Sequence, residues 1–392
     1  MQKRNVLFVA HHLTVGGVQK SLVSALNAID YESNNVTLYL RKNRTDLLPY
    51  INRNVKVIIN DDTRHYYRTP RAILYQFSCL LARLLHNKSL EQKRKDGLAD
   101  YIRKRQMEYE YASFFADSSY DIAISYVQGV TTEFVSQYVS AKKKVTFYQV
   151  STDEAHDIHE RTLPCFDQIV VEHAEIKNSL SEWYRGIVDP NRIFILENYV
   201  DVDLLRRQGS EFTIERVGNR PIICSCGRFA GIKGFDLAVN AARILRQRGH
   251  EFLWYVVGDG PERPNIEKII SDYRLQDCVK LTGMLTNPYP YIMGCDIYVQ
   301  PSKEEGLSIA MLEALLLERP MVTTKTVGGC TMVVDGQNGV LTEINAESLA
   351  DGIERLLKES QLRERIQNEL KQNDYSEARR KYQRDWAALL EA

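Results

Sequence analysis

The chain has 392 residues, of which 44% are hydrophobic and 26% are charged, so it is long enough for two globular domains. Its formal net charge is zero, which argues against a nucleic-acid-binding protein that relies on global positive charge. No apolar run approaches the roughly 18 residues of a membrane-spanning helix, and the apolar run at residues 6–10 is too short for a signal-peptide core. Seven scattered cysteines without a C-x-x-C pair predict reduced thiols and a cytoplasmic location.

The first half of the sequence alternates short apolar runs with helical patterns. A strand is expected at residues 6–10, followed by a Gly16-Gly17 turn and a helix near residues 21–29. Further strands are expected at residues 36–40, 55–59, 122–126, 145–148, 169–171 and 193–196. Short apolar runs bounded by turns, with helices between them, are typical of a parallel sheet covered on both faces.

Residues 64–116 interrupt this alternation with a segment that is basic, rich in aromatic side chains and helical by pattern. Its apolar residues follow helical spacing: Ile73, Leu74, Phe77, Leu80, Leu81, Leu84 and Leu85. Two interpretations stay open. The segment is either a helical hairpin packed on its domain with a solvated basic face, or a surface that contacts an anionic membrane or a lipid substrate.

A second series of strands and helices begins after residues 197–220, where frequent Asn, Asp, Gly and Ser predict turns and a linker. Strands are expected at residues 222–227, 252–258, 279–282, 297–300 and 321–324, and helices at 233–248, 265–273, 289–293, 309–317, 348–358, 361–370 and 376–390. Two successive doubly wound α/β domains follow from this order, with a cleft between them. Ligands of such sheets bind at the carboxyl ends of strands.

The segment that begins at Pro301 joins a predicted strand to a predicted helix and carries two carboxylates, Glu305 and Glu313, eight positions apart. Backbone N–H groups at the start of the helix form an anion site, and Glu313 lies about one and a half turns into that helix. Amides suit phosphate and carboxylates suit sugar hydroxyls, so the segment predicts a nucleotide-sugar site. Its turn residues are Gly306, Leu307 and Ser308.

Two cations, Arg228 and Lys233, follow the strand predicted at residues 222–227. The Arg side chain offers a fork that matches phosphate oxygens, and the Lys side chain offers a point charge. Together at a strand end and a helix start they suit a diphosphate. The alternative is a solvated loop with an ordinary glycine turn.

Other polar residues at strand ends carry weaker signals. Gly16-Gly17 is not a G-x-G-x-x-G fingerprint, which disfavours a dehydrogenase. Asp259 is interpreted as a turn or helix-capping residue, with a nucleotide contact as the alternative. Asp201 and Asp203 form a D-x-D that could bind a hard cation, but a turn or hinge is the preferred interpretation.

Histidines give no zinc site by sequence, because no third nitrogen or sulfur ligand with suitable spacing follows His156 and His159. His11 and His12 end the first predicted strand and face the predicted cleft. One of them is a candidate substrate contact, and loop packing is the alternative.

Taken together, these residues resemble the retaining glycosyltransferases of family 4, which have the two-domain GT-B fold. Glu305 and Glu313 match the family's E-x7-E motif. The other matches are the early Gly16-Gly17 loop, the diphosphate-clamping pair Arg228 and Lys233, the junction motif Asn198-Tyr199-Val200-Asp201, the late turns Gly328-Gly329 and Asp335-Gly336-Gln337-Asn338-Gly339, and a final helix with Trp386.

The resemblance implies a domain arrangement. Residues 1–200 would form an N-terminal acceptor-binding Rossmann-like domain, with the helical insertion at about 64–116. Residues 201–375 would form a C-terminal nucleotide-sugar-binding Rossmann-like domain, and the two would face a central cleft. Residues 376–392 would form a helix that crosses back to the N-terminal domain.

The resemblance also implies roles for individual residues. Glu313 would bond the ribose hydroxyls and Glu305 would contact the donor sugar, while Arg228 and Lys233 would stabilise the departing nucleoside diphosphate, so no metal or other cofactor is expected. The acceptor hydroxyl would attack on the leaving-group face with retention, and the β-phosphate would take its proton. Gln149 stands where many relatives have a histidine, and it is a candidate contact to the acceptor or sugar.

The resulting expectation is a metal-independent retaining glycosyltransferase that uses a nucleotide-sugar, with UDP as the expected nucleotide. The expected acceptor is a glycan, glycolipid or lipid-linked molecule of surface polysaccharide or glycoconjugate biosynthesis. The expected location is the cytoplasm at the inner face of the plasma membrane, with membrane contact through residues 64–116 and no nucleic-acid partner. An inactive adaptor that binds a partner enzyme or glycan, and a nucleotide-sugar epimerase, are the alternatives.

Overall fold

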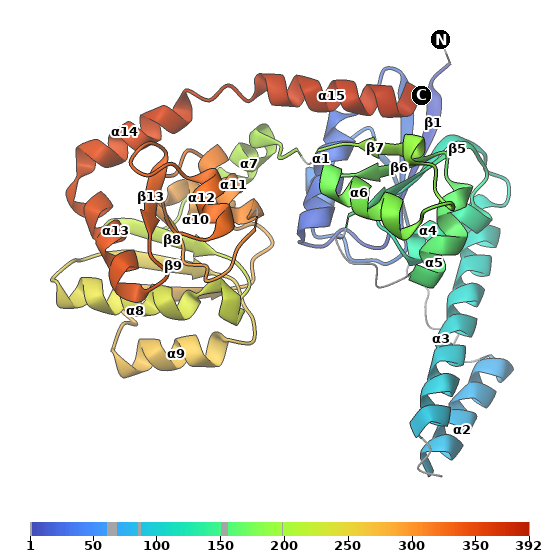
Figure 1. The fold of residues 1–392 in the computed structure, drawn as a ribbon, viewed down its shortest axis with the longest axis horizontal. Coiled ribbons are helices and arrows are strands. Elements are labelled where there is room, and N and C mark those ends of the chain that lie inside the picture. The colour runs from blue at the N-terminus through green and yellow to red at the C-terminus, as the bar shows by residue number, and fades with distance from the viewer. Residues whose placement is uncertain are drawn as a thin grey trace. The chain divides into compact units, whose positions relative to one another are not determined.

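The computed structural model describes residues 2–60, 69–84, 88–149, 156–197, 199–306 and 308–391. The chain divides into two compact units, and the polypeptide passes from one to the other twice (Figure 1). Unit 1 comprises Met1–Tyr199 and Ala378–Ala392, and unit 2 comprises Val200–Glu377. Each unit has its own parallel sheet.

Unit 1 is built on a sheet whose described strands are ordered β3-β2-β1-β4-β5-β6-β7, and each adjacent pair is parallel. The strands coincide with the predicted apolar runs, and residues 6–10 of β1 are all buried, as expected of a strand covered on both faces. The strands are β1 (Arg4–Ala10), β2 (Asn34–Leu40), β3 (Lys56–Ile59), β4 (Tyr120–Ser125), β5 (Ala141–Tyr148), β6 (Gln168–Val171) and β7 (Ile193–Ile195).

Unit 1 also contains helices, and one of them comes from the far end of the sequence. They are α1 (Gly17–Ala28), α2 (Pro70–Leu84), α3 (Lys88–Glu110), α4 (Val130–Tyr138), α5 (His156–Thr162), α6 (Ala174–Trp183) and α15 (Ser376–Glu391). In α15, the buried Trp386 stacks on Phe147 of β5 with ring centroids 5.7 Å apart and also contacts Phe8 of β1. The core of unit 1 therefore includes the last helix of the chain.

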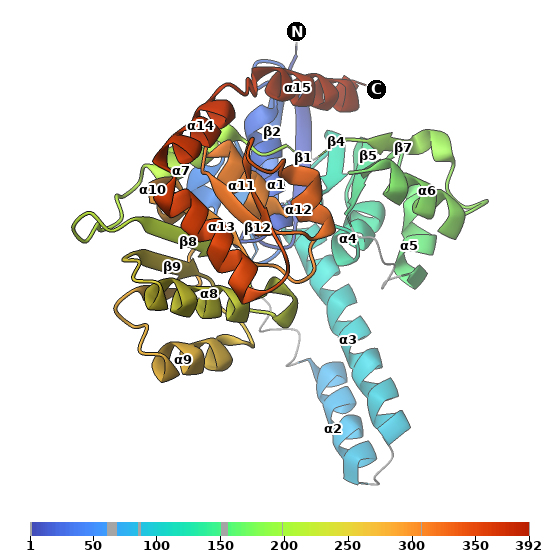
Figure 2. The ribbon, with the colours of Figure 1, turned by 60° about the vertical axis from the view of Figure 1, so that its left-hand side comes forward.

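The insertion predicted at residues 64–116 forms a helical hairpin, in which α2 and α3 lie side by side and extend away from the sheet of unit 1 (Figures 1 and 2). Residues 64–68 and 85–87 of the predicted segment lie outside the described residues. At the base, α3 continues into a π-helical turn, Tyr111–Phe115. Arg41 and Glu110 form a fully buried ion pair there, with Nε and Oε2 2.8 Å apart.

Unit 2 is built on a second parallel sheet, whose described strands are ordered β10-β9-β8-β11-β12-β13. The strands are β8 (Ile222–Cys226), β9 (Leu253–Val257), β10 (Val279–Gly283), β11 (Ile297–Gln300), β12 (Met321–Thr324) and β13 (Gly339–Thr342). Each strand predicted at residues 222–324 is confirmed, whereas β13 was not predicted. Since β8, β11 and β12 are neighbours, the loops after their carboxyl ends meet at one edge of the sheet.

The helices of unit 2 include two that the sequence did not predict, at residues 202–209 and 327–332. The helices of this unit are α7 (Val202–Gly209), α8 (Phe235–Gln247), α9 (Arg263–Asp272), α10 (Tyr289–Gly294), α11 (Ile309–Leu316), α12 (Val327–Met332), α13 (Ala346–Lys358) and α14 (Ser360–Lys371). The interpretation of residues 197–220 as turns and linker alone is wrong, because α7 forms within it. Asp201 caps this helix, its carboxylate accepting the backbone N–H of Leu204 at 3.1 Å.

Candidate functional site

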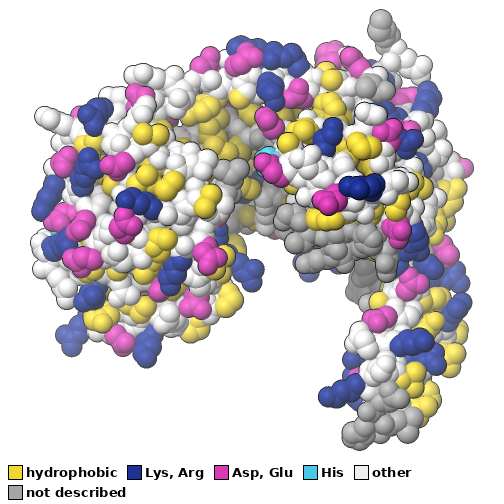
Figure 3. All heavy atoms as spheres, viewed as in Figure 1, with side chains coloured by type: hydrophobic (Ala, Val, Ile, Leu, Met, Phe, Trp, Pro, Cys, Tyr) yellow, Lys and Arg dark blue, Asp and Glu magenta, His cyan; other side chains and the backbone are white. Residues whose placement is uncertain are grey.

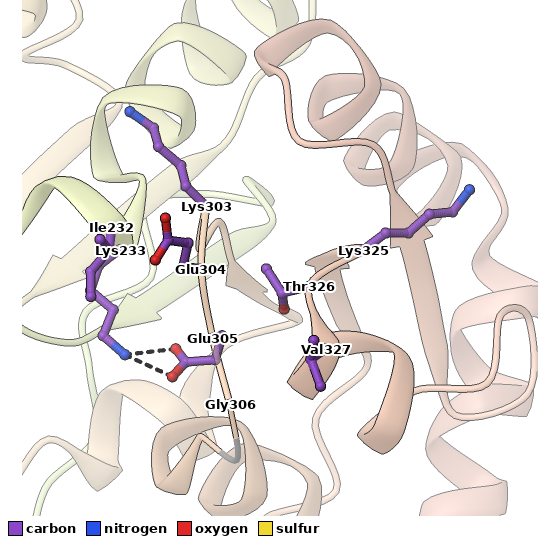
Figure 4. A pocket seen from close by; sticks show the side chains of 9 residues that line it. All are labelled: Ile232, Lys233, Lys303, Glu304, Glu305, Gly306, Lys325, Thr326 and Val327. Carbon is purple, nitrogen blue, oxygen red and sulfur yellow. Dashed lines mark hydrogen bonds and ion pairs between the residues drawn. The ribbon is translucent and has the colours of Figure 1, made fainter. Parts of the chain in front are cut away.

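A pocket of about 710 Å³ lies at the carboxyl edge of the unit 2 sheet (Figure 4). Three loops line it, one after β8, one after β11 and one after β12. The lining residues are Ile232, Lys233, Lys303, Glu304, Glu305, Gly306, Lys325, Thr326 and Val327. Two of the predicted catalytic residues, Lys233 and Glu305, therefore lie together in one pocket, although 72 positions separate them in the sequence.

Lys233 and Glu305 point toward one another and form a bidentate ion pair (Figure 4). The Lys233 Nζ donates to both Glu305 carboxylate oxygens, at 2.9 and 2.7 Å. The Lys233 side chain is 27% exposed and the Glu305 side chain 9%, so the pair is partly screened from water but reachable from the pocket. An ammonium and a carboxylate are thus fixed side by side, where one can bind a phosphate oxygen and the other a hydroxyl.

A chain of buried side chains along β11 holds the Glu305 carboxylate. The Tyr298 hydroxyl donates to Oε1 of Gln300 at 3.1 Å, and the Gln300 amide donates to Oγ of Ser302 at 3.0 Å. The Ser302 hydroxyl donates in turn to Oε2 of Glu305 at 3.0 Å. Because Ser302 is buried, its hydroxyl would lose its acceptor at a cost in free energy if Glu305 moved away.

Backbone contacts fix the loop that carries Glu305. The N–H groups of Lys303 and Glu304 donate to the Ile232 carbonyl, at 2.7 and 3.2 Å, and the N–H of Gly328 donates to the Glu305 carbonyl at 2.9 Å. Gly328 and Gly329 were predicted to form a turn, but the structure places both of them in helix α12. A Cβ on Gly328 would lie 1.5 Å from the Gly306 carbonyl oxygen, so only glycine allows this approach.

Gly234 makes a second close approach, on the other side of the pocket loop. Its φ of +65° is a left-handed conformation that favours glycine, and a Cβ there would lie 2.0 Å from the Pro301 carbonyl oxygen. This packing brings the turn that carries Lys233 against the loop that carries Glu305. Gly328 of α12 and Gly234 therefore both position the loops that carry the Lys233–Glu305 ion pair.

Glu313 lies in α11, as the spacing predicts, but it does not line the pocket. Its side chain is buried, and its Oε1 accepts a hydrogen bond from the Tyr289 hydroxyl at 2.7 Å. Ser308 is the N-cap of α11, and its hydroxyl accepts the Met311 N–H at 3.5 Å. Leu307 lies outside the described residues. Tyr289 is a partner of the site that sequence reasoning missed.

The other cations near this edge differ in their pairing. Arg228 follows β8 and is exposed; within the described residues it has no ion pair or hydrogen bond through its side chain, and it is not among the pocket-lining residues. Lys303 pairs with Asp236 at 2.8 Å and Lys325 pairs with Glu343. Sequence reasoning missed Lys303 and Lys325, although each follows a predicted strand end by a few residues. Four cations thus lie close to the carboxyl ends of β8, β11 and β12.

Gly16, Gly17, His11 and Gln149 lie in unit 1, whereas the pocket is formed by unit 2 alone. Gly17 is the first residue of α1, and Gly16 precedes it in an extended conformation. His11 follows β1, and burial together with the nearby Lys42 and Arg41 lowers its pKa to about 4. The backbone N–H of Gln149 donates to Oε1 of Gln128 at 3.3 Å, and the buried side-chain oxygen of Gln149 has no hydrogen-bond partner among the described residues.

The remaining sequence candidates have structural roles. Asp259 accepts the N–H of Gly260 at 2.7 Å and pairs with Arg263 at 3.0 Å, so it is a turn residue as preferred. Asn198 of the junction motif lies outside the described residues. No three His, Cys, Asp or Glu side chains are grouped to hold a metal in the part of the chain that the structure describes. None of the described helices has the length and apolar character to cross a membrane.

Comparisons with known proteins find similar glycosyltransferases. The family model described as "Glycosyl transferases group 1" matches residues 208–373. The chain is 36% identical over 157 residues to the alpha-D-kanosaminyltransferase of Streptomyces kanamyceticus, covering 39% of this chain and 41% of the relative. It is 31% identical over 154 residues to the lipopolysaccharide core biosynthesis glycosyltransferase LpsE of Rhizobium meliloti, covering 39% of this chain and 44% of the relative. The matches thus span less than half the length of these curated relatives.

Likeness of fold extends over the whole chain. The structure of Anabaena HepE in complex with UDP and glucose superposes with a TM-score of 0.65 at 14% identity, covering 99% of this chain and 100% of that one. At this identity the likeness shows the fold, which is the two-domain α/β GT-B fold predicted from the sequence. Residues 208–373 of this chain are thus similar to the glycosyl transferases group 1 family.

Proposed function

We propose that this protein is a retaining glycosyltransferase that moves a sugar from a nucleotide-sugar, expected to be a UDP-sugar, to an acceptor hydroxyl. The observation that carries the proposal is the Lys233–Glu305 ion pair, fixed in a pocket at the carboxyl edge of the unit 2 sheet. Ammonium and carboxylate groups in one pocket suit a ligand that has both a phosphate and sugar hydroxyls. The UDP and glucose bound by HepE support the nucleotide and the sugar class.

In this proposal the cations receive the leaving group. Lys233 and the exposed Arg228 place positive charge against the diphosphate as the bond from the anomeric carbon to the phosphate oxygen breaks. They supply the charge that a metal ion supplies in other sites, so the reaction needs no metal. Glu305 binds donor-sugar hydroxyls, and the buried chain through Ser302 keeps its carboxylate in place when the Lys233 ammonium turns toward phosphate.

The remaining steps use the substrates themselves. The acceptor oxygen forms its bond to the anomeric carbon on the face that the diphosphate leaves, which retains configuration. The acceptor proton passes to an oxygen of the departing β-phosphate, so no enzymic nucleophile is required. Glu313 accepts hydrogen bonds from the ribose hydroxyls in addition to the one from the Tyr289 hydroxyl. It can accept them together because a carboxylate has about four lone-pair sites. The main-chain N–H groups of residues 306–308 are proposed to contact the phosphates, and Gly16 and Gly17 are proposed as further donor contacts.

The acceptor is proposed to be a glycan, glycolipid or lipid-linked molecule of surface polysaccharide or glycoconjugate biosynthesis. The similarity to LpsE, a lipopolysaccharide core biosynthesis glycosyltransferase, supports this class. His11 and Gln149 of unit 1 are the proposed acceptor contacts, and the unpartnered oxygen of Gln149 offers an acceptor for a sugar hydroxyl. A cytoplasmic location, at the inner face of the plasma membrane, fits the seven unpaired cysteines.

The test is a screen of the purified protein for thermal stabilisation and sugar release with UDP-, GDP-, ADP- and TDP-sugars, with and without EDTA. We expect one nucleotide to stabilise the protein and its sugar to be released slowly, with EDTA having no effect. Binding without release in the presence of candidate acceptors would favour the inactive adaptor, which the comparisons do not support. Failure to bind any of these nucleotides would refute the proposal.

A further inference from the structure

Helix α2 exposes a continuous apolar stripe, formed by Ile73, Leu74, Phe77, Leu80 and Leu81, each more than half exposed. These positions recur at intervals of one, three and four residues, so they lie on one face of the helix. Figure 3 shows apolar and basic side chains next to one another on the protruding hairpin. Five large apolar side chains on one short helix form a contiguous patch of the kind that marks an interaction surface.

The opposite face of α2 is already occupied. Ala72 and Ala82 are buried, and the ring of Tyr75 packs against Gly97 of α3, where a Cβ would lie 3.1 Å from the ring. Helix α3 therefore covers one face of α2 and leaves the apolar stripe of α2 open. The stripe cannot be buried by a rotation of α2 without the loss of these contacts.

Ion pairs hold the base of the hairpin on unit 1. Arg41 and Glu110 form the fully buried pair at 2.8 Å, and Arg103 of α3 lies 3.2 Å from the buried Glu133 of α4. Separating the partners of a buried ion pair strongly destabilises a protein, because it leaves an uncompensated buried charge. The two pairs therefore fix the orientation of α3. The apolar stripe of α2 is thus presented outward on a fixed support.

The hairpin is cationic in a chain whose net charge is zero. Helices α2 and α3 contain nine Lys or Arg residues and five Asp or Glu residues, which gives the hairpin a net formal charge of +4. Among the described residues, Lys88, Lys93 and Arg94 at the far end of the hairpin have no carboxylate partner. Unpaired cations thus lie at the same end as Leu80 and Leu81.

We propose that the apolar stripe of α2 docks the protein on an anionic lipid bilayer. The apolar side chains enter the boundary between headgroups and acyl chains, and Lys88, Lys93 and Arg94 bind lipid phosphates. Charge complementarity selects this occupant over a second copy of the chain, because two hairpins of the same positive charge repel one another. The docking goes beyond the transfer reaction and does not depend on it.

Sedimentation with lipid vesicles tests the docking on the full-length protein. We expect the protein to sediment with vesicles of equimolar phosphatidylcholine and phosphatidylglycerol and to stay in the supernatant with phosphatidylcholine alone. The variant Phe77→Asp, at an exposed position, should lose binding. The matched control Met284→Asp, at an equally exposed apolar residue of unit 2, should bind like the wild type. The double variant Lys93→Gln and Arg94→Gln should weaken binding roughly thirtyfold, since each cation near an anionic surface contributes roughly fivefold.

Two results would overturn the proposal. One is equal sedimentation of wild type and Phe77→Asp with the anionic vesicles. The other is a lipid-free dimer in analytical ultracentrifugation that Phe77→Asp dissociates, which would assign the stripe to a second copy. Nucleotide-sugar hydrolysis in solution, measured on the same variants, separates this test from that of the transfer reaction, because Phe77 lies outside the pocket.

Discussion

The ammonium of Lys233 lies 2.9 and 2.7 Å from the two carboxylate oxygens of Glu305, so each group neutralises the other before any substrate binds. In the proposed reaction, the diphosphate of the donor therefore shares the Lys233 ammonium with Glu305 or displaces Glu305 from it. Because Ser302 also donates to Glu305, the carboxylate keeps a partner when the lysine turns away. In the proposed reaction, the positive charge of Lys233 then becomes available to the leaving group.

Removal of the Lys233 charge should abolish sugar transfer while the fold is kept. Lys233→Ala takes away a cation aimed at the leaving group, and loss of one such group lowers kcat by about 10²–10³-fold. The fold should survive because Glu305 keeps its bond from Ser302. Steady-state kinetics and circular dichroism check both statements, with Lys358→Ala, an exposed lysine paired to Glu354, as the charge control. Near-wild-type turnover in Lys233→Ala would remove Lys233 from the site.

The hydroxyl of Ser302 should act on catalysis through Glu305. Ser302→Ala leaves the Gln300 amide without its acceptor and frees the Glu305 carboxylate, so we expect a lower kcat together with a loss of about 1–3 kcal/mol of stability. Ser225→Ala is the matched control. Ser225 is equally buried and also links two partners, Trp254 and the Val299 carbonyl, but it does not contact the pocket residues. If both variants lose stability and only Ser302→Ala loses kcat, the hydroxyl positions Glu305. Equal kcat values would leave Ser302 with a structural role alone.

The two glycines near Glu305 and Lys233 should respond differently to a methyl group. Gly328→Ala places a Cβ 1.5 Å from the Gly306 carbonyl oxygen, so the loop must move and stability should fall by about 1–3 kcal/mol or more. Gly231→Ala adds a methyl where no atom lies within 4 Å and should be close to neutral. Denaturant unfolding measures both free energies, and a neutral Gly328→Ala would contradict the packing described for this loop.

The neutral His11 should make stability depend on pH. Its pKa is about 4 in the fold against 6.5 in the unfolded chain, through burial and the nearby cations. Between about pH 6.5 and about pH 4, His11 is protonated in the unfolded chain and neutral in the folded chain. The free energy of unfolding therefore falls as the pH is lowered through this range. His11→Gln should remove part of this slope, measured by urea unfolding at a series of pH values. An imidazole signal of His11 that titrates near 6.5 by NMR would contradict this expectation.

The sequence predicts much of the fold because each strand of a doubly wound sheet is a short apolar run between turns. The same reasoning places residues 222–227 and 297–300 at one ligand-binding edge, and the structure brings Lys233 and Glu305 together there. Helix α7 escaped prediction because the capping role of Asp201 resembles a turn signal. Spacing also cannot show that Tyr289 bonds Glu313, since that contact depends on how α10 packs against α11.

The hairpin is a second case in which sequence spacing cannot show how two helices pack. Helical spacing predicts the apolar stripe of α2, but spacing is the same for a buried stripe and for an exposed one. Which face α3 covers is decided by Ala72 and Ala82, whose small side chains let the helices approach. Whether the apolar stripe is exposed therefore depends on where α3 packs as well as on the sequence of α2.

The position of Trp386 has a consequence for the order in which the chain folds. This residue completes an aromatic cluster with Phe8 and Phe147, so unit 1 needs a residue that is translated after unit 2. Unit 2, from Val200 to Glu377, is complete before α15 is made. Unit 2 can therefore finish folding before unit 1, although most of unit 1 is translated first. The hydrophobic core of unit 1 stays incomplete until α15 packs against β1 and β5.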